Sequence, residues 1–223
     1  RRQRQMCIRD RGSRVDFSED TFSFKVPCVI VTTSAENWSM EELSSVAIDD
    51  EKAGETIVDY LIEHGHTKIA EIGANLELSQ TAILRHNGYL NSFKKHGITP
   101  DERYYERARF SYDSAYRAMK KLLEKNIEIT AVYAISDVMA IGAIRAILDK
   151  GLRVPEDISI TGFDGSTLAE YYNPKIVSIR QPHKDMAARS VELLFSMIDL
   201  HKGSCHEIIP FELTEGESVA RID

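Results

Sequence analysis

The chain has 223 residues, of which 43% are hydrophobic and 28% are charged, and its formal net charge is −7. This length is ample for a buried core, arranged as one domain or as two small lobes. The acidic balance argues against a broad nucleic-acid-binding surface, and no apolar stretch is long enough to span a bilayer. The composition therefore predicts a globular protein with no membrane partner.

Three cysteines, Cys7, Cys28 and Cys205, lack the spacing of a metal site. Their odd number indicates free thiols in a reducing compartment, which predicts a cytoplasmic location. The first 14 residues are rich in arginine but lack the apolar segment of a secretory signal. They fit a basic arm for nucleic acid, a disordered tail, or a sequence that is not native to the gene. Because no helical or aromatic pattern accompanies the charges, we expect residues 1–21 to be a disordered or non-native lead.

Strands and helices are predicted to alternate along the first half of the chain. Short apolar runs indicate strands, and apolar residues at helical spacing indicate helices. The predicted strands are residues 26–31, 46–49 and 67–73. The predicted helices are residues 50–64, 79–96 and 112–125. Gly65 and Gly97 are expected to end the first two helices, and Ser111 is expected to cap the third.

A strand–helix–strand unit over residues 131–166 organises the second half. An apolar strand at 131–135 precedes a helix that Asp137 could cap, and Gly151 offers the left-handed position that ends this helix. A second strand at 158–161 leads to Asp164. The remaining elements are a strand at 176–179, a helix at 183–200 and a strand at 208–213. This alternating order predicts an α/β fold with parallel sheets covered by helices.

Asp137 and Asp164 follow two of these strands, at the edge where open α/β sheets bind ligands. Carboxylates beside the guanidinium of Arg85 would suit a ligand with many hydroxyl groups. The residues alone leave simpler roles open: a helix cap for Asp137, a turn for Asp164 and a solvated side chain for Arg85. The pattern shows neither a phosphate-binding glycine loop nor a nucleophile with a partner. Histidines on both sides of Gly65 lack a third metal ligand, so no metal and no cofactor are predicted.

Five segments of the chain resemble the ligand-binding core of LacI/GalR-type bacterial transcription repressors. The matching segments are YLIEHGHTKIAEIG, RHNGY, SDVMAIGA, GLRVPEDISITGFD and NPKIVSIRQP, in the order found in that family, and the resemblance covers roughly residues 46–213. It implies a periplasmic-binding-protein-like fold of type I, with two doubly wound parallel-sheet lobes and the ligand between them.

The resemblance also assigns candidate ligand-binding residues. Arg85 stands in the R-x-x-G-Y motif, Ser136 and Asp137 precede M-A-x-G, and Asp164 ends the G-F-D motif. Thr32 follows the first strand, and Gln181 lies in the Q-P dipeptide where the chain crosses between lobes. The family often carries asparagine in place of Ser136.

The resemblance further implies a domain division and partners. Residues 22–49 and 181–209 would form a partial N-terminal lobe, and residues 50–180 and 210–223 would form the C-terminal lobe. We expect the chain to be N-terminally truncated, because the family begins with a helix-turn-helix that would bind operator DNA. A homodimer is expected, with Ile141 and Tyr172 in its interface, although burial of Ile141 within the monomer is the alternative.

The sequence thus predicts a non-enzymatic sensor of a small effector, a sugar or sugar derivative, which controls DNA binding allosterically. Two other classes remain open. One is a sugar-binding protein of a transporter, which would need a signal peptide. The other is an α/β enzyme, which would need an acid–base pair acting on a substrate.

Overall fold

The computed structural model describes residues 7–10, 26–36, 42–77, 79–200 and 203–222. The chain forms two compact units. Unit 1 comprises residues 1–49, 77–81 and 182–211, and unit 2 comprises residues 50–76, 82–181 and 212–223. The predicted lobe boundaries lie at residues 49/50, 180/181 and 209/210, whereas the units divide at 49/50, 181/182 and 211/212, and residues 77–81, predicted in the C-terminal lobe, belong to unit 1. Among the described residues, no helix is long and apolar enough to cross a membrane.

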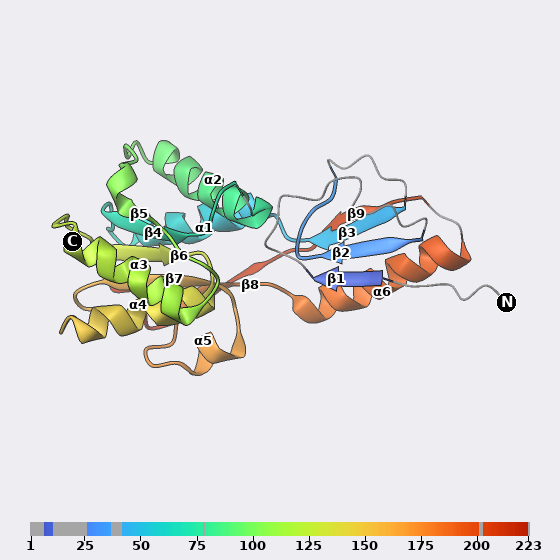
Figure 1. The fold of residues 1–223 in the computed structure, drawn as a ribbon. Helices are drawn as coiled ribbons and strands as arrows, with labels where there is room; N and C mark the ends of the chain where they lie inside the picture. Colours follow the sequence, from blue (N-terminus) through green and yellow to red (C-terminus); the bar gives the residue numbers. More distant parts are fainter. Residues whose placement is uncertain (1–6, 11–25, 37–41, 78, 201–202, 223) are drawn as a thin grey trace. The chain divides into compact units, whose positions relative to one another are not determined.

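Unit 2 is built on a six-stranded sheet with the order β10-β8-β7-β6-β4-β5 (Figure 1). Its strands are β4 (Ile69–Gly73), β5 (Tyr105–Arg107), β6 (Ala131–Ala134), β7 (Ser159–Asp164), β8 (Val177–Arg180) and β10 (Glu212–Thr214). The neighbours from β5 to β8 pair in parallel. The predicted parallel sheet is confirmed from β5 to β8, and the edge strand β10 departs from it by pairing antiparallel with β8. Between β8 and β10 the chain runs through α6 and β9 of unit 1 before it re-enters unit 2. An antiparallel pair of strands does not need a crossover helix packed on the same sheet.

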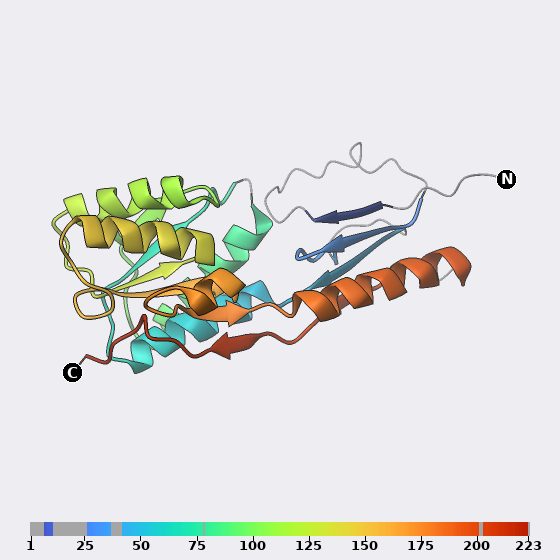
Figure 2. The same ribbon diagram turned by 90° about the horizontal axis from the view of Figure 1, so that it is seen from below.

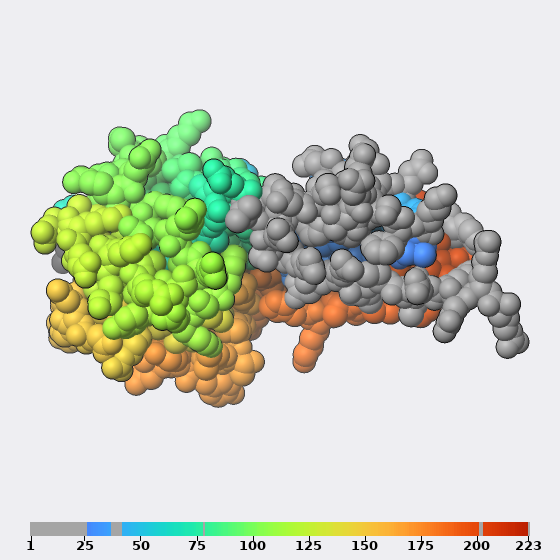
Figure 3. Space-filling view, in the orientation of Figure 1, coloured from blue at the N-terminus to red at the C-terminus, as the bar shows by residue number. Residues whose placement is uncertain are grey.

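Helices cover both faces of this sheet. They are α1 (Asp50–Glu63), α2 (Gln80–Lys95), α3 (Tyr112–Glu124) and α4 (Asp137–Asp149), followed by the short α5 (Thr167–Tyr171). Figure 2 shows α3 and α4 side by side on one face and α1 on the other. In the space-filling view, the side chains of α3 cover much of the visible face of unit 2 (Figure 3). Successive residues of β7 face opposite layers: Phe163 lies under Arg85 of α2, and Gly162 lies against Asp137 of α4.

Two glycines allow α1 and α2 to cross at close range. A Cβ atom at Gly54 would lie 2.7 Å from the carbonyl oxygen of Arg85, and one at Gly88 would lie 2.3 Å from that of Glu51. Such distances exclude any side chain at either position without a shift of the backbone. The crossing therefore fixes where α2 holds Arg85.

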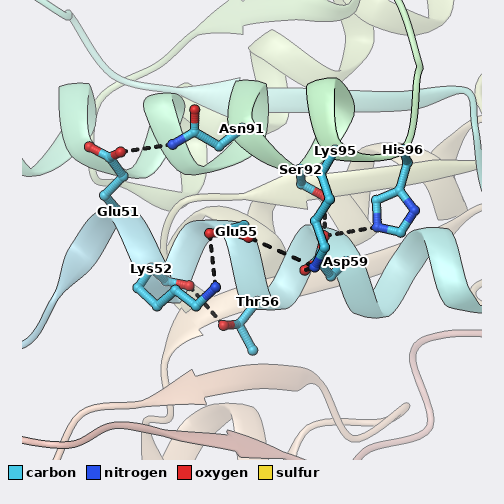
Figure 4. A network of polar contacts seen from close by, with 9 residues as sticks. All are labelled: Glu51, Lys52, Glu55, Thr56, Asp59, Asn91, Ser92, Lys95 and His96. Atoms are coloured by element: carbon cyan, nitrogen blue, oxygen red, sulfur yellow. Dashed lines mark hydrogen bonds and ion pairs between the residues drawn. The ribbon is translucent and has the colours of Figure 1, made fainter.

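Polar contacts also join α1 to α2 on the solvent side (Figure 4). Asp59 accepts hydrogen bonds from Ser92 (2.6 Å) and Lys95 (2.6 Å) and lies 3.1 Å from Nε2 of His96. Asn91 donates to Glu51 over 2.7 Å. The close glycine crossing and these polar contacts both join α1 to α2.

The predicted helix ends are largely confirmed. Ser111 accepts a hydrogen bond from the N–H of Ser114, and Gly65, Gly97 and Gly151 have φ angles of 93°, 69° and 82°. The alternative that Asp137 caps α4 is excluded. Ser136, the residue before Asp137, is the N-cap. Its backbone is extended, as an N-cap requires, and its hydroxyl oxygen accepts a hydrogen bond from the N–H of Met139.

Unit 1 contains a parallel sheet with the order β1-β2-β3-β9, one face of which is covered by α6 (His183–Asp199). The strands are β1 (Cys7–Asp10), β2 (Cys28–Val31), β3 (Leu43–Ala47) and β9 (His206–Ile208). β1 lies in the lead that was predicted to be disordered or non-native, and it instead pairs with β2; the rest of that lead lies outside the described residues.

The strand predicted at residues 208–213 is also wrong as a single element. It is divided between β9 in unit 1 and β10 in unit 2. Pro210 stands between them, and proline cannot donate to a strand ladder. β5 was not predicted, because its three residues carry no apolar run.

Candidate functional site

The candidate site lies in unit 2, where β6, β7 and β8 end. Chain order reverses between β4 and β6: the chain leaves β4 for β5 on one side and returns to β6 on the other. Ligands of open α/β sheets bind at the carboxyl ends of strands beside such a switch point. Five of the six predicted ligand-binding residues lie at this edge, namely Arg85, Ser136, Asp137, Asp164 and Gln181.

Arg85 is buried, with only 4% of its surface exposed, so the alternative of a solvated arginine is wrong. Its Nε donates to Asp50 over 2.8 Å, and its Nη1 donates to the carbonyl of Ile135 over 2.6 Å. The guanidinium lies 3.5 Å from the ring centroid of Phe163, which is close enough for a cation–π interaction. Burial alone would lower the pKa of Arg85, but the charges of Asp50 and Asp164 outweigh it and raise the pKa.

Asp164 is the partly open carboxylate of the cluster, with 32% of its side chain exposed. Its Oδ1 accepts a hydrogen bond from Gln181 over 2.8 Å and lies 3.7 Å from Nη1 of Arg85. Desolvation raises its pKa to about 7, and the charge of Asp137 adds to the rise, while Arg85 opposes it. The guanidinium cannot fully offset burial because Asp50 already binds it more closely.

The backbone of Asp164 is strained, with φ at 113°, a region that residues other than glycine avoid. Such conformations cost on the order of 1–3 kcal/mol and persist where the surrounding structure holds them, often at binding sites. The strain therefore supports a functional role for this turn.

Ser136 and Asp137 lie at the start of α4 and are buried, with 2% and 1% of their surface exposed. The carboxylate of Asp137 accepts from the hydroxyl of Ser178 over 2.6 Å and from the N–H of Ser166 over 2.6 Å. Desolvation raises the pKa of Asp137, although these hydrogen bonds oppose the rise.

Gln181 carries an unsatisfied acceptor. Its Nε2 donates to Asp164, but its Oε1 has no hydrogen-bond partner within the described part of the chain, and the residue is only 6% exposed. An unsatisfied buried oxygen is costly unless a ligand or water donates to it. Together with Asp164, it presents acceptors for a ligand that donates hydrogen bonds.

Thr32 belongs to unit 1, where it follows β2. Its φ of 74° is unusual for a β-branched residue, so it shares the backbone strain of Asp164. Ile141 on α4 and Tyr172 after α5, the two predicted interface residues, are both partly exposed.

Sequence reasoning missed the residues that hold the cluster together. Asp50, Phe163 and Ser178 each contact a predicted site residue. Phe163 stands inside the G-F-D segment, so its motif could have drawn attention to it. No motif in the sequence around Asp50 or Ser178 indicates a role in the site. Their roles depend on contacts with Arg85 and Asp137, which lie 35 and 41 residues away in the sequence.

A second polar pair, His86 of α2 and Glu71 of β4, lies outside this group of residues. Nδ1 of His86 lies 2.6 Å from the buried carboxylate of Glu71. Burial raises the pKa of Glu71; burial would lower the pKa of His86, but the hydrogen bond to Glu71 raises it. Within the described ranges, no group of three or more His, Cys, Asp or Glu side chains could hold a metal ion.

A separate groove of about 160 Å³ lies in unit 2, lined mainly by side chains of α3 and α4, among them Tyr116, Lys120 and Asp149. Its charged side chains are solvated, and Tyr116 and Asp149 already bond to each other over 3.1 Å. It offers no buried unsatisfied group, so the strand edge remains the stronger candidate.

The fold is that of α/β ligand-binding domains, whose ligands meet the carboxyl ends of strands. Residues 58–219 match the model of the periplasmic binding protein-like domain family. The HTH-type transcriptional regulator MalR of Clostridium butyricum is 38% identical over 213 residues, which are 95% of this chain and 63% of that protein. The HTH-type transcriptional repressor PurR of Vibrio atlanticus is 34% identical over 79% of this chain and 52% of that protein.

A solved structure of similar fold is the transcriptional regulator CelR in complex with cellobiose, with a TM-score of 0.79 and 32% identity over 86% of this chain and 59% of that one. The chain belongs to the periplasmic binding protein-like domain family, in the form shared by LacI/GalR-type transcriptional regulators. It spans between 52% and 63% of the length of these three relatives.

Proposed function

We propose that this chain is the ligand-sensing core of a bacterial LacI/GalR-type transcriptional regulator. It binds a small effector, a sugar or sugar derivative, and acts in the cytoplasm. The observation that carries the proposal is the half-open carboxylate of Asp164 beside the unsatisfied Oε1 of Gln181 and the guanidinium of Arg85. Paired acceptors beside a fixed cation suit vicinal hydroxyl groups, which both donate and accept hydrogen bonds.

The predicted site residues take different parts in this proposal. Asp164 and Gln181 accept hydrogen bonds from the effector. Arg85 lies 3.7 Å from Asp164 and favours its ionised form. Ser136 and Asp137 support the site from behind, since both are buried and already bonded within unit 2. Thr32, which lies in unit 1, stays a separate candidate for ligand binding, because its strained backbone supports a role in binding.

The effector would change the affinity of a DNA-binding part for operator DNA, because a ligand that prefers one conformation shifts the population towards it. The name of MalR as an HTH-type regulator supports a DNA partner. A transporter role finds no such support, since the relatives described above are transcriptional regulators.

A homodimer is part of the same proposal, because regulators that read two half-sites are usually two-fold symmetric. Tyr172 follows α5, which exposes Leu168 at 48% and Tyr171 at 82%. We assign these residues, with the partly exposed Ile141, to the dimer interface.

Calorimetric titration of the chain against cellobiose, a set of monosaccharides, adenine and guanine tests the ligand class. We expect a sugar to bind, and we expect Asp164→Ala to weaken that binding by about 1–3 kcal/mol, the cost of stranding a buried polar partner. Asp157→Ala is the matched control, because it removes an exposed carboxylate that pairs with Arg153. Binding of a nucleobase with no response to sugars would overturn the sugar assignment, and sugar binding that tolerates Asp164→Ala would overturn the site.

A further inference from the structure

The turn at the end of β7 holds two consecutive residues in left-handed conformations. Asp164 has φ at 113° and Gly165 has φ at 63°. Glycine adopts such a conformation readily, but aspartate does so only where neighbouring groups hold it. The turn also sets the direction in which the carboxylate of Asp164 points.

Three backbone N–H groups around this turn donate to fixed acceptors. Gly165 donates to the hydroxyl oxygen of Ser178 over 3.1 Å, and Ser166 donates to Oδ2 of Asp137 over 2.6 Å. Gln181 donates to the carbonyl of Asp164 over 3.1 Å. The first two acceptors are themselves joined, since the hydroxyl of Ser178 donates to Oδ1 of Asp137 over 2.6 Å. Asp137 and Ser178 thus hold two successive amides of the turn.

The carboxylate of Asp137 faces the sheet rather than solvent. A Cβ atom at position 162 would lie 2.3 Å from Oδ1 of Asp137, so only glycine leaves room for the carboxylate there. Asp137 is 1% exposed, and both of its oxygens accept hydrogen bonds from within unit 2. Its carboxylate is not needed as a helix cap, because Ser136 caps α4.

We propose that Asp137 is a positioning residue of the ligand site and not a ligand contact: with Ser178, it holds the Asp164–Ser166 turn in the left-handed shape that presents Asp164. The meaning of this role for binding rests on the proposed function, since Asp164 must meet the effector for its position to matter. The role itself is a property of the ligand-free chain and can be tested without any effector.

Amide hydrogen exchange measured by NMR tests the role in three variants. Asp137→Ala removes the acceptor for Ser166, and Ser178→Ala removes the acceptor for Gly165. We expect these two amides to exchange about tenfold faster or more, while amides inside β7 and α4 keep their native rates, because only the local opening becomes easier. Asp149→Ala on the same helix is the control, and it should leave both amides unchanged.

Asp137→Asn separates charge from geometry. Its amide oxygen can still accept from Ser166, so exchange at the turn should stay close to the native rate. The charge is lost, however, and the pKa of Asp164 should fall below about 7, because the charge of Asp137 contributes to its elevation. Carbon-13 detection of the Asp164 carboxyl during a pH titration measures this shift.

Two results would overturn the proposal. One is a folded Asp137→Ala chain whose Gly165 and Ser166 amides exchange at native rates. The other is faster exchange spread evenly over β7 and α4, which would mean general destabilisation. If Asp137→Ala does not fold, Ser178→Ala decides: native exchange at Gly165 in that variant would overturn the proposal. Failure of every sugar to bind would affect the proposed function and leave these readouts intact.

Discussion

Asp164 combines a strained backbone with an unfavourable charge environment. Its pKa rises from the ordinary value of 3.8 to about 7, so the folded chain holds this proton more tightly than the unfolded chain does. The stabilisation from this proton is present below about pH 4 and is lost as pH rises to about 7. A residue that destabilises the fold at neutral pH is expected where binding rather than stability selects it.

Asp164→Asn removes the titration while keeping the size of the side chain. The native chain loses the stabilisation from this proton between pH 4 and 7, whereas the variant has no such proton to lose. The free energy of unfolding of the variant should therefore rise relative to that of the native chain as the pH rises. Relative to the native chain, its free energy of unfolding should be higher at pH 8 than at pH 5 by on the order of 1–2 kcal/mol, after allowance for solvent screening. Urea unfolding of both chains at the two pH values measures the difference. An equal difference at both values would show that Asp164 does not hold the proton.

Sequence reasoning identified the residues of this edge but not all of their roles. Ser136 and Asp137 are neighbours, and either could cap a helix by its residue type. The choice depends on Ser178 and Ser166, which occupy the carboxylate of Asp137 from distant parts of the chain. Motifs report residue types and order, whereas hydrogen-bond partners depend on the tertiary fold.

Among the elements, the crossing of α1 and α2 determines where Arg85 lies. Gly88→Ala would place a Cβ atom 2.3 Å from the carbonyl oxygen of Glu51, so the helices must separate. We expect a loss of about 1–3 kcal/mol in the free energy of unfolding, or more because the contact is with backbone. Gly203→Ala is the control, since nothing lies within 4 Å of a Cβ atom there. Equal effects at both positions in urea unfolding would contradict the tight crossing.

Most helices could be predicted because their signals are local. α1 and α4 combine periodic apolar residues with a glycine that follows the last turn, and both end within one residue of their predicted limits. Short strands lack such signals. β5 is defined by pairing with β4, and the division between β9 and β10 follows from membership in two different sheets.

At the scale of the whole molecule, the proposed dimer makes a separate prediction. Ile141→Asp should place a charge in the two-fold apolar surface without disturbing the core, because Ile141 is only partly buried. In a chain that dimerises, sedimentation velocity should then show monomers, while circular dichroism stays near native. Ile144→Asp is the contrasting variant, since Ile144 is fully buried and its replacement should unfold unit 2. A dimer that survives Ile141→Asp, or loss of fold in that variant, would argue against the assigned surface.

The central claim is that a sugar-class effector meets unit 2 at the edge formed by Asp164, Gln181 and Arg85. Chemical-shift mapping of the isotope-labelled chain with the sugar that binds in calorimetry tests this claim most directly. We predict the largest changes at the Asp164 carboxyl, the Gln181 side-chain amide, the Arg85 Nε–H group and the amides of Gly165 and Ser166. Changes that instead cluster around the groove lined by Tyr116 and Lys120, with the strand edge unaffected, would contradict it.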